Sequence, residues 1–198
     1  MKLKVNEIFY SLQGEGARAG SANIFIRLSG CKTQKACLAL GVNCDTEFES
    51  GRNISLDELL AEIETYGCQN IIWTGGEPAQ QLDDEIIKFF KARNFYQAIE
   101  TSGLFPLSNG LDWITVSPKV AEHVIQRNFA KGVNELRYVR RSGQGIPQPS
   151  VKAQHYFISP HSDGEFINYE NLEFCIELVK QNPKWKLSLQ QHKIWKVR

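Results

Sequence analysis

The sequence predicts an α/β fold, a partial (β/α) barrel of about six parallel strands with helices on the outside. Short runs rich in β-branched and aromatic residues alternate with amphipathic helical segments, which is typical of a parallel sheet covered by helices. Polar residues follow the carboxyl ends of these runs, where barrel enzymes keep their chemistry. The 198 residues fall short of the roughly 250 of a complete barrel, so we expect a partial barrel in a single domain, residues 1–198.

Composition excludes several classes of function. The formal net charge is +1, from 23 basic and 22 acidic residues, so we expect no binding to nucleic acid or to an anionic membrane surface. No apolar run approaches the roughly 20 residues that span a bilayer, and the N-terminus lacks a signal-peptide pattern. We therefore expect a cytoplasmic protein, in which clustered cysteines are more often metal ligands than disulfide partners.

The first elements carry two candidate binding features. Residues 3–10 alternate like a short strand and lead into a turn in which Gly14 and Gly16 flank Glu15. Exposed backbone beside a carboxylate suits an amidine-like pair of N–H groups, although a plain surface turn fits the same residues. Residues 23–28 predict a buried strand that contains Arg27. A buried arginine needs an anion, either a protein carboxylate or a ligand carboxylate.

The middle of the chain predicts two strand–helix units. Ser55 and Glu58 form a capping box at the start of a helix over 55–66, with Leu56, Leu59, Leu60 and Ile63 on its buried side. Residues 70–74 then predict a buried strand that ends in Gly75-Gly76-Glu77-Pro78, followed by a helix over 81–93. Flexible backbone and a carboxylate at the end of a strand suit an amino-acid ligand, although a simple strand–helix turn is the alternative.

The second half repeats this alternation. Strands are predicted over 96–101, 113–116, 135–139, 155–158 and 185–190, with a weak helix over 121–129 and a stronger one over 171–180. Residues 140–150 hold two glycines and two prolines, which predicts a flexible loop. Polar residues expected at or just beyond strand ends are Glu77, Glu100, Ser117, Lys119, Ser159 and His192.

Three of the five cysteines lie in a predicted loop, residues 30–53, inserted after the first barrel strand. Cys31, Cys37 and Cys44 have the spacing C-x5-C-x6-C. Structural zinc usually takes four ligands at closer paired spacing, whereas a [4Fe–4S] cluster held by three cysteines leaves one iron open to a small molecule. Spacing alone leaves both metals open. Cys68 and Cys175 are expected to be free thiols, with Cys175 in the core.

Several motifs together resemble those of the radical S-adenosylmethionine (SAM) enzymes and, among them, the 7-carboxy-7-deazaguanine synthase family. The Gly-Gly-Glu-Pro motif is shared by many radical enzymes, whereas the opening and closing motifs are specific. The resemblance runs nearly end to end and rests on residues 12–16, 25–31, 44–46, 74–78, 100–103, 117–119 and 187–193. It implies a fold of the radical SAM type.

The resemblance implies a lyase of queuosine and 7-deazapurine biosynthesis. Cys31, Cys37 and Cys44 would bind three irons of a [4Fe–4S] cluster, and SAM would bind the fourth. Most of the superfamily has C-x3-C-x2-C, and Cys37 is the only candidate here for the second ligand. Cleavage of SAM would give a radical that takes hydrogen from C6 of 6-carboxy-5,6,7,8-tetrahydropterin, after which the ring contracts and loses ammonia.

The resemblance also implies the binding residues, with no catalytic side chain beyond the cluster and cofactor. Those for SAM are Gly76, Glu77, Glu100, Ser117, Pro118, Lys119, Ile158, Ser159, Pro160 and His161. Those for the substrate are Leu12, Gln13, Gly14, Glu15, Arg27, Thr74, His192 and Arg198. Thr46 matches a position that binds Mg2+, a hard cation expected against the substrate carboxylate.

Two other functions remain open from the sequence. A small activase could generate a glycyl radical on a partner protein, and would have no use for Arg27 or Glu15. A non-catalytic module could have kept the fold and bound zinc through the irregular cysteine loop. The expected partners of the lyase are its small pterin substrate and an unidentified electron donor, and the resemblance adds a homodimer.

Overall fold

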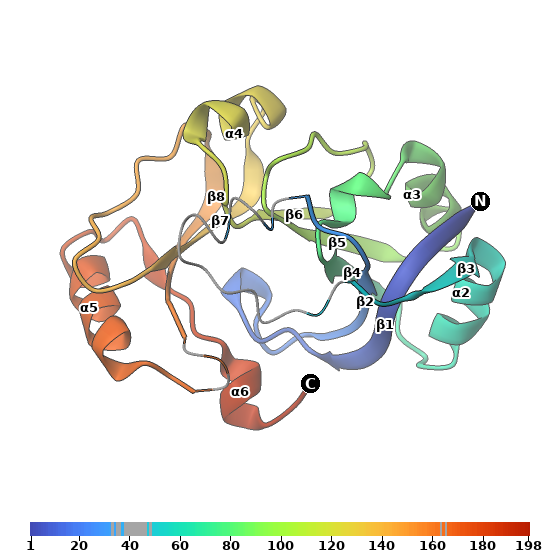
Figure 1. Cartoon of the computed structure of the whole chain (residues 1–198), viewed down its shortest axis with the longest axis horizontal. Coiled ribbons are helices and arrows are strands. Elements are labelled where there is room, and N and C mark those ends of the chain that lie inside the picture. Colours follow the sequence, from blue (N-terminus) through green and yellow to red (C-terminus); the bar gives the residue numbers. More distant parts are fainter. Residues whose placement is uncertain (33, 35–36, 38–46, 48, 163, 165) are drawn as a thin grey trace.

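The strands form one open, curved sheet in the computed structural model, which describes residues 1–32, 34, 37, 47, 49–162, 164 and 166–198. Within those residues the sheet has nine strands in the order β3-β1-β2-β4-β5-β6-β7-β8-β9. Its two edge strands do not pair with each other, so the barrel is partial, as predicted. Figure 1 shows the sheet curving around an interior, with α2 to α5 along its outside.

Most of the sheet is parallel. Pairing is parallel at each step from β2 to β9, while β1 is antiparallel to both β2 and β3. Strand β3 was not predicted from the sequence, and it occupies the last residues of the predicted 30–53 loop. The strands are β1 (Lys2–Leu12), β2 (Ala22–Leu28), β3 (Arg52–Ser55), β4 (Asn70–Gly75), β5 (Tyr96–Thr101), β6 (Trp113–Val116), β7 (Val133–Arg140), β8 (Ala153–Pro160) and β9 (Lys186–Leu187).

The helices begin where the sequence supplies caps. The predicted capping box is present at α2, since Ser55 and Glu58 each accept from the other's backbone N–H. Helix α3 begins at Asp84 rather than at 81, because Asp83 is its N-cap and accepts from Ile86 N at 2.9 Å. The helices are η1 (Gly16–Arg18), α2 (Leu56–Glu64), η2 (Pro78–Gln80), α3 (Asp84–Lys91), α4 (Glu122–Asn128), α5 (Tyr169–Lys180) and α6 (Gln191–Trp195).

The prediction was wrong at the end of the chain. The expected strand over 185–190 is reduced to the two residues of β9, and an unpredicted helix, α6, follows it. The apolar alternation of Trp185, Leu187 and Leu189 predicted more strand than forms. Trp185 packs instead against Tyr138 and Tyr156, with ring centroids 5.7 and 5.4 Å away.

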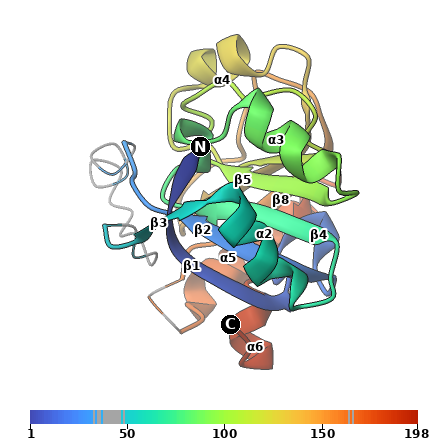
Figure 2. The ribbon, with the colours of Figure 1, turned by 90° about the vertical axis from the view of Figure 1, so that its right-hand side faces the viewer.

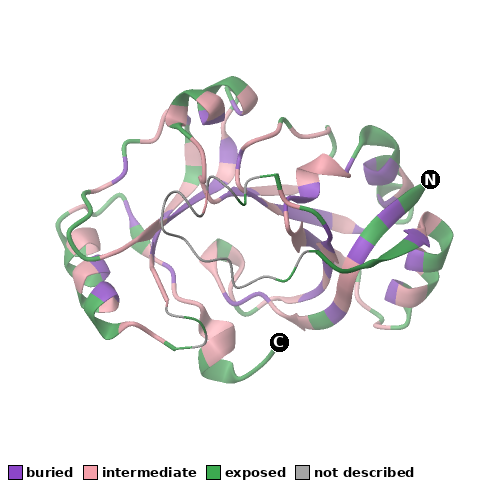
Figure 3. Ribbon diagram, viewed as in Figure 1, coloured by how far each residue is buried: buried purple, intermediate pink, exposed green. Residues whose placement is uncertain are grey.

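The two faces of the sheet have opposite character, which follows from the period of two along a strand. Outward side chains such as Leu28, Trp73 and Ile99 are fully buried beneath the helices and form the apolar core, which also contains the predicted Cys175. In Figure 3 the buried residues lie along the strands and on the sheet-facing sides of the helices. Figure 2 shows α2 and α3 side by side against the outer surface.

The inward side chains are polar along the middle strands. In the sheet register Glu100 of β5 lies beside Thr115 of β6, which lies beside Glu135 of β7. Charge and hydrogen-bonding groups are therefore gathered inside the barrel, apart from the apolar core. None of the helices in the described part of the chain has the length and apolar character needed to cross a bilayer.

Candidate active site

The turn between β1 and β2 folds into the barrel interior, where side chains from distant strands hold it. Gly16 N donates to Ser188 Oγ at 2.9 Å, and Ala17 N donates to Glu135 Oε2 at 3.0 Å. Gly16 has a φ of 70°, and a Cβ there would collide with the Glu135 carboxylate, so the position requires glycine. The turn is therefore part of the interior rather than a plain surface turn (Figure 1).

The opening and closing motifs of the sequence meet at this turn. Gln191 N donates to Gly14 O at 2.9 Å. A Cβ on Gly14 would collide with the imidazole of His192, so the ring lies directly on the glycine backbone. Leu12 is the last residue of β1 and leads into the turn. The structure thus brings together the predicted substrate residues 12–15 and His192, which are separated by most of the chain.

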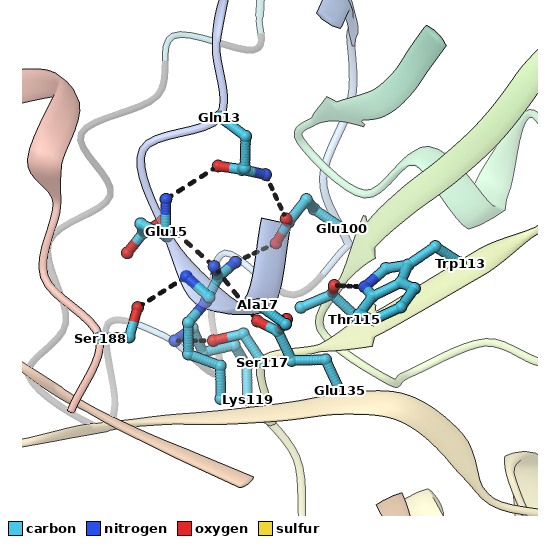
Figure 4. Close-up of polar contacts among 12 residues, drawn as sticks. Gln13, Glu15, Ala17, Glu100, Trp113, Thr115, Ser117, Lys119, Glu135 and Ser188 are labelled. Atoms are coloured by element: carbon cyan, nitrogen blue, oxygen red, sulfur yellow. Dashed lines mark hydrogen bonds and ion pairs between the residues drawn. The ribbon is translucent and has the colours of Figure 1, made fainter. Parts of the chain in front are cut away.

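A buried arginine joins the turn to the barrel wall. The side chain of Arg137 in β7 is 6% exposed and forms an ion pair with Glu100. Its Nη1 atom lies 3.7 Å from Glu15 Oε2 and 3.5 Å from Glu135 Oε1. Gln13 provides a second link, since it donates to Glu100 Oε1 at 3.0 Å and accepts from Glu15 N at 3.1 Å. Gln13, Glu15, Glu100 and Glu135 converge in Figure 4.

Burial dominates the electrostatics of this group. Desolvation raises the pKa of Glu100 to about 7, partly offset by Arg137, and Glu135 and Glu15 raise it further. The pKa of Glu135 is also raised by burial. Burial alone would lower the pKa of Arg137, but the carboxylates of Glu100, Glu15 and Glu135 outweigh it and raise that pKa. The guanidinium therefore keeps its charge while the carboxylates compete for it.

Sequence reasoning missed Glu135 and Arg137 as site residues. The signal was present, because in the run from Glu135 to Tyr138 charged residues alternate with Leu136 and Tyr138 with period two. Such alternation predicts a strand with one polar and one apolar face. In the structure Leu136 lies in the outer core, whereas Glu135 and Arg137 face the interior.

The Gly-Gly-Glu-Pro motif packs against the start of the cysteine loop. Gly76 N donates to Leu28 O at 2.9 Å, and Glu77 N donates to Gly30 O at 2.9 Å. A Cβ on Gly76 would collide with the Gly30 carbonyl and come within 3.1 Å of Cys31 Cβ. The motif therefore lies beside the first predicted cluster ligand, as a cluster-bound amino-acid ligand would require.

The carboxylate of Glu77 is bound entirely by protein groups. It is 1% exposed and accepts from Thr101 Oγ1 at 2.7 Å, from Ser102 N at 2.9 Å and from Ala79 N at 3.2 Å, as well as from Ser102 Oγ. It thereby fixes the Gly76 backbone to the end of β5. The Glu77 carboxylate therefore ties the Gly-Gly-Glu-Pro motif to Thr101 and Ser102.

The remaining predicted SAM residues lie at the carboxyl ends of β6 and β8. Lys119 Nζ donates to Ser117 Oγ at 3.3 Å. A cavity of about 150 Å3 is lined by Pro118, Lys119 and His161, together with Tyr138, Val139, Arg140, Arg141 and Gln144. Ser159 is 3% exposed, and its Oγ has no hydrogen-bond partner among the described residues. A buried hydroxyl without a partner is uncommon in folded proteins, and in the sheet register Ser159 neighbours Val139, which lines the cavity.

The predicted SAM residues of β8 have different surroundings. The Ile158 side chain is fully buried in the outer core, and its carbonyl accepts from Ser188 N at 2.9 Å. Pro160 ends β8, where it lies beside Arg140 in the register. His161 Nε2 lies 2.9 Å from Arg141 Nη2. Of residues 158–161, His161 is the one that lines the cavity.

Arg27 has a protein carboxylate beside it. Its Nε lies 3.6 Å from Glu7 Oε2, and its guanidinium lies 5.2 Å from the Phe9 ring centroid. Arg198 forms an ion pair with the same Glu7 and lies 5.5 Å from the same ring. In the sheet register Arg27 neighbours Thr74. The predicted substrate residues Arg27, Thr74 and Arg198 are thus gathered at one side of the interior.

The predicted metal ligands are described only in part. Cys31 and Cys37 are half-buried, whereas Cys44 and Thr46 lie outside the described residues. Within the described ranges, no group of three His, Cys, Asp or Glu side chains is placed to hold a metal ion.

The chain is similar in sequence to several known enzymes over nearly its whole length. The chain is 37% identical over 201 residues to the 7-carboxy-7-deazaguanine synthase of Bacteroides thetaiotaomicron, and the match covers all of both chains. It is 34% identical to that of Caulobacter vibrioides, covering 98% of each chain, and 32% identical to that of Haemophilus influenzae, covering 95% of this chain and 90% of the relative.

Among solved structures, the crystal structure of QueE from Escherichia coli matches with a TM-score of 0.68 at 24% identity. The match covers 96% of this chain and 94% of the other. This likeness supports the partial barrel and its order of elements. No family model matches the chain.

Proposed function

Because the chain belongs to the 7-carboxy-7-deazaguanine synthase family, we propose that it is a radical SAM lyase that converts 6-carboxy-5,6,7,8-tetrahydropterin to 7-carboxy-7-deazaguanine with loss of ammonia, in queuosine biosynthesis. One observation carries the proposal for this chain. The turn at 12–16 and the segment at 188–192, which hold the motifs specific to the family, are bonded to each other inside the barrel. The interior beside the turn is lined by the charged groups of Glu15, Glu100, Glu135 and Arg137, which suit a polar heterocycle.

The substrate would lie against the turn. The backbone of Leu12, Gln13 and Gly14 and the Glu15 carboxylate offer acceptors to the amidine-like N–H edge of the pterin, and His192 lies over the same glycine. Arg27, Thr74 and Arg198 would hold the substrate carboxylate at the other side of the interior. Glu7 already shields both guanidinium groups, so a carboxylate ligand would share or replace an existing ion pair.

The cofactors would lie at the carboxyl ends of the strands. Cys31, Cys37 and Cys44 would hold the [4Fe–4S] cluster. Gly76 would meet the methionine end of SAM, and its lack of a side chain lets its backbone pack directly against Gly30 and Cys31. Ser117, Pro118, Lys119 and the strand end from Ile158 to His161 would hold the nucleoside, and Ser159 Oγ has the free hydrogen-bonding capacity for it. When bound, the cluster and SAM supply the radical that abstracts hydrogen.

Several finer features belong to the same proposal. Thr46 would bind a Mg2+ ion against the substrate carboxylate. Residues 1–198 would act as a single domain, with the 30–53 loop carrying the cluster. From the family resemblance we also expect a homodimer and an electron donor that reduces the cluster. We expect no nucleic-acid or membrane partner.

Anaerobic reconstitution with iron and sulfide, followed by assay with the pterin, SAM, Mg2+ and a chemical reductant, tests the proposal. We expect 7-carboxy-7-deazaguanine as the product, identified by mass spectrometry. Arg27→Ala should greatly reduce its formation, because the substrate carboxylate would lose a charged partner. A fully loaded cluster that gives no deazapurine would refute the proposal, and a colourless protein with one bound zinc would favour the non-catalytic alternative.

A further inference from the structure

The proposed binding sites do not use the guanidinium of Arg137, although it lies in the interior between two of their carboxylates. It stands between Glu15, on the turn that would read the substrate, and Glu100, on the strand that would border SAM. Gln13 makes a second bridge, since it donates to the Glu100 carboxylate and accepts from the backbone N–H of Glu15. The four residues therefore form a closed ring, Glu15–Gln13–Glu100–Arg137, that links the turn to the wall of the barrel. Gln13, Glu15 and Glu100 are labelled in Figure 4.

The two ends of the guanidinium are engaged to different degrees. Nη2 is bonded to Glu100, whereas Nη1 lies 3.5 and 3.7 Å from its two carboxylates and has no hydrogen-bond partner among the described residues. A buried donor without a partner is costly, and the contact between Arg137 Nη1 and Glu15 is too long for a hydrogen bond. A ligand that fixes the Glu15 carboxylate can shorten this contact.

We propose that Arg137 is a positioning residue for substrate recognition, which orients the Glu15 carboxylate of the substrate-reading turn and ties it to Glu100 beside the cofactor pocket. The inference rests on the proposed function, because it treats the turn as the substrate site. Arginine suits this role better than lysine, since its planar fork can reach two carboxylates at once. Glu135 supports the same arrangement by accepting from Ala17 N on the turn.

The test measures pterin binding without the cluster or SAM. The fluorescent probe is 6-carboxypterin, an oxidised and stable relative of the substrate, titrated with the wild type, Arg137→Lys, Glu15→Gln and the double variant. Arg137→Lys keeps the charge and removes the fork. We expect affinity to fall by about tenfold or more, because the bound probe could no longer draw Glu15 and the guanidinium into a hydrogen bond between charged groups. The double variant should bind no worse than the weaker single variant, because both changes break one linkage.

The matched control is Arg18→Lys. Arg18 is also a partly buried arginine and follows the same turn, but its guanidinium bonds to Asn23 and lies over the Tyr96 ring, and no ion pair joins it to Glu15 among the described residues. We expect its affinity to remain within about twofold of the wild type, since it has no charged contact with the turn carboxylate. Equal losses for both lysine variants, or additive losses in the double variant, would overturn the proposal.

Hydrogen exchange separates this inference from the proposed function. In Arg137→Lys the amides of Gly16 and Ala17 should exchange faster than in the wild type, while amides of the outer core strands do not change. If the wild type fails to bind 6-carboxypterin, the proposed function is refuted, and unchanged exchange at the turn would in addition refute the role of Arg137. If Arg137→Lys does not fold, Glu100→Gln opens the same ring from its other end and should weaken binding of the probe in the same way.

Discussion

Replacing Glu77 by glutamine is expected to destabilise the ligand-free protein, and the size of the effect follows from four hydrogen bonds. One carboxylate oxygen accepts from Thr101 Oγ1 and Ala79 N, and the other accepts from Ser102 N and Ser102 Oγ. A glutamine amide has only one oxygen. Whichever way it is turned, its NH2 group faces one of the two backbone N–H groups, which loses its acceptor.

An unpaired buried N–H group costs about 1–3 kcal/mol, and the remaining bonds also lose the assistance of the negative charge. We therefore expect a loss of about 2 kcal/mol, which for a chain of this length lowers the melting temperature by roughly 4–8 °C. Differential scanning calorimetry of the apo protein measures it. The control is Glu62→Gln on α2, whose partner Arg52 is 60% exposed, so that its loss should be near zero. Equal melting temperatures for the two variants would refute the reasoning.

Three further predictions concern the interior turn, the buried carboxylates and the cysteine loop. Gly16→Ala should lower the free energy of unfolding, measured in urea, by about 2–4 kcal/mol, because it adds a clash with a buried carboxylate to the cost of a left-handed backbone. Gly20 also has a left-handed backbone but open space around it, so Gly20→Ala should lower it by only about 1–2 kcal/mol. Burial raises the pKa of Glu100 from 4.5 to about 7, so between these two pH values the folded chain holds a proton that the unfolded chain releases. The free energy of unfolding should therefore fall as pH rises from 4.5 to about 7, and the fall should be smaller in Glu100→Gln. Iron content after reconstitution should drop in Cys37→Ala and stay unchanged in Cys68→Ala, whose thiol packs against the apolar core; equal iron in the two variants would show that Cys37 is no ligand.

The order and type of most elements were set by local information in the sequence. The capping box of Ser55 and Glu58, the apolar runs of the central strands and the periodic helices each depend on neighbours a few residues apart. Such signals were correct at α2, β4, β5 and β8. They were insufficient at 185–190, where a short apolar alternation was read as a strand although Trp185 is held by two tyrosines from other strands.

The sequence by itself determined the mainly parallel sheet, the helices α2 to α5 and the motifs that identify the family, because these are encoded in spacing along the chain. Only the tertiary structure decided which charged groups share the interior. Glu15, Glu100 and Arg137 are far apart in sequence, and their pairing depends on strand register and on a turn that requires glycine at 16. No local pattern reports such a contact, since its energy comes from burying opposite charges together. The role proposed for Arg137 could therefore be found only in the folded chain.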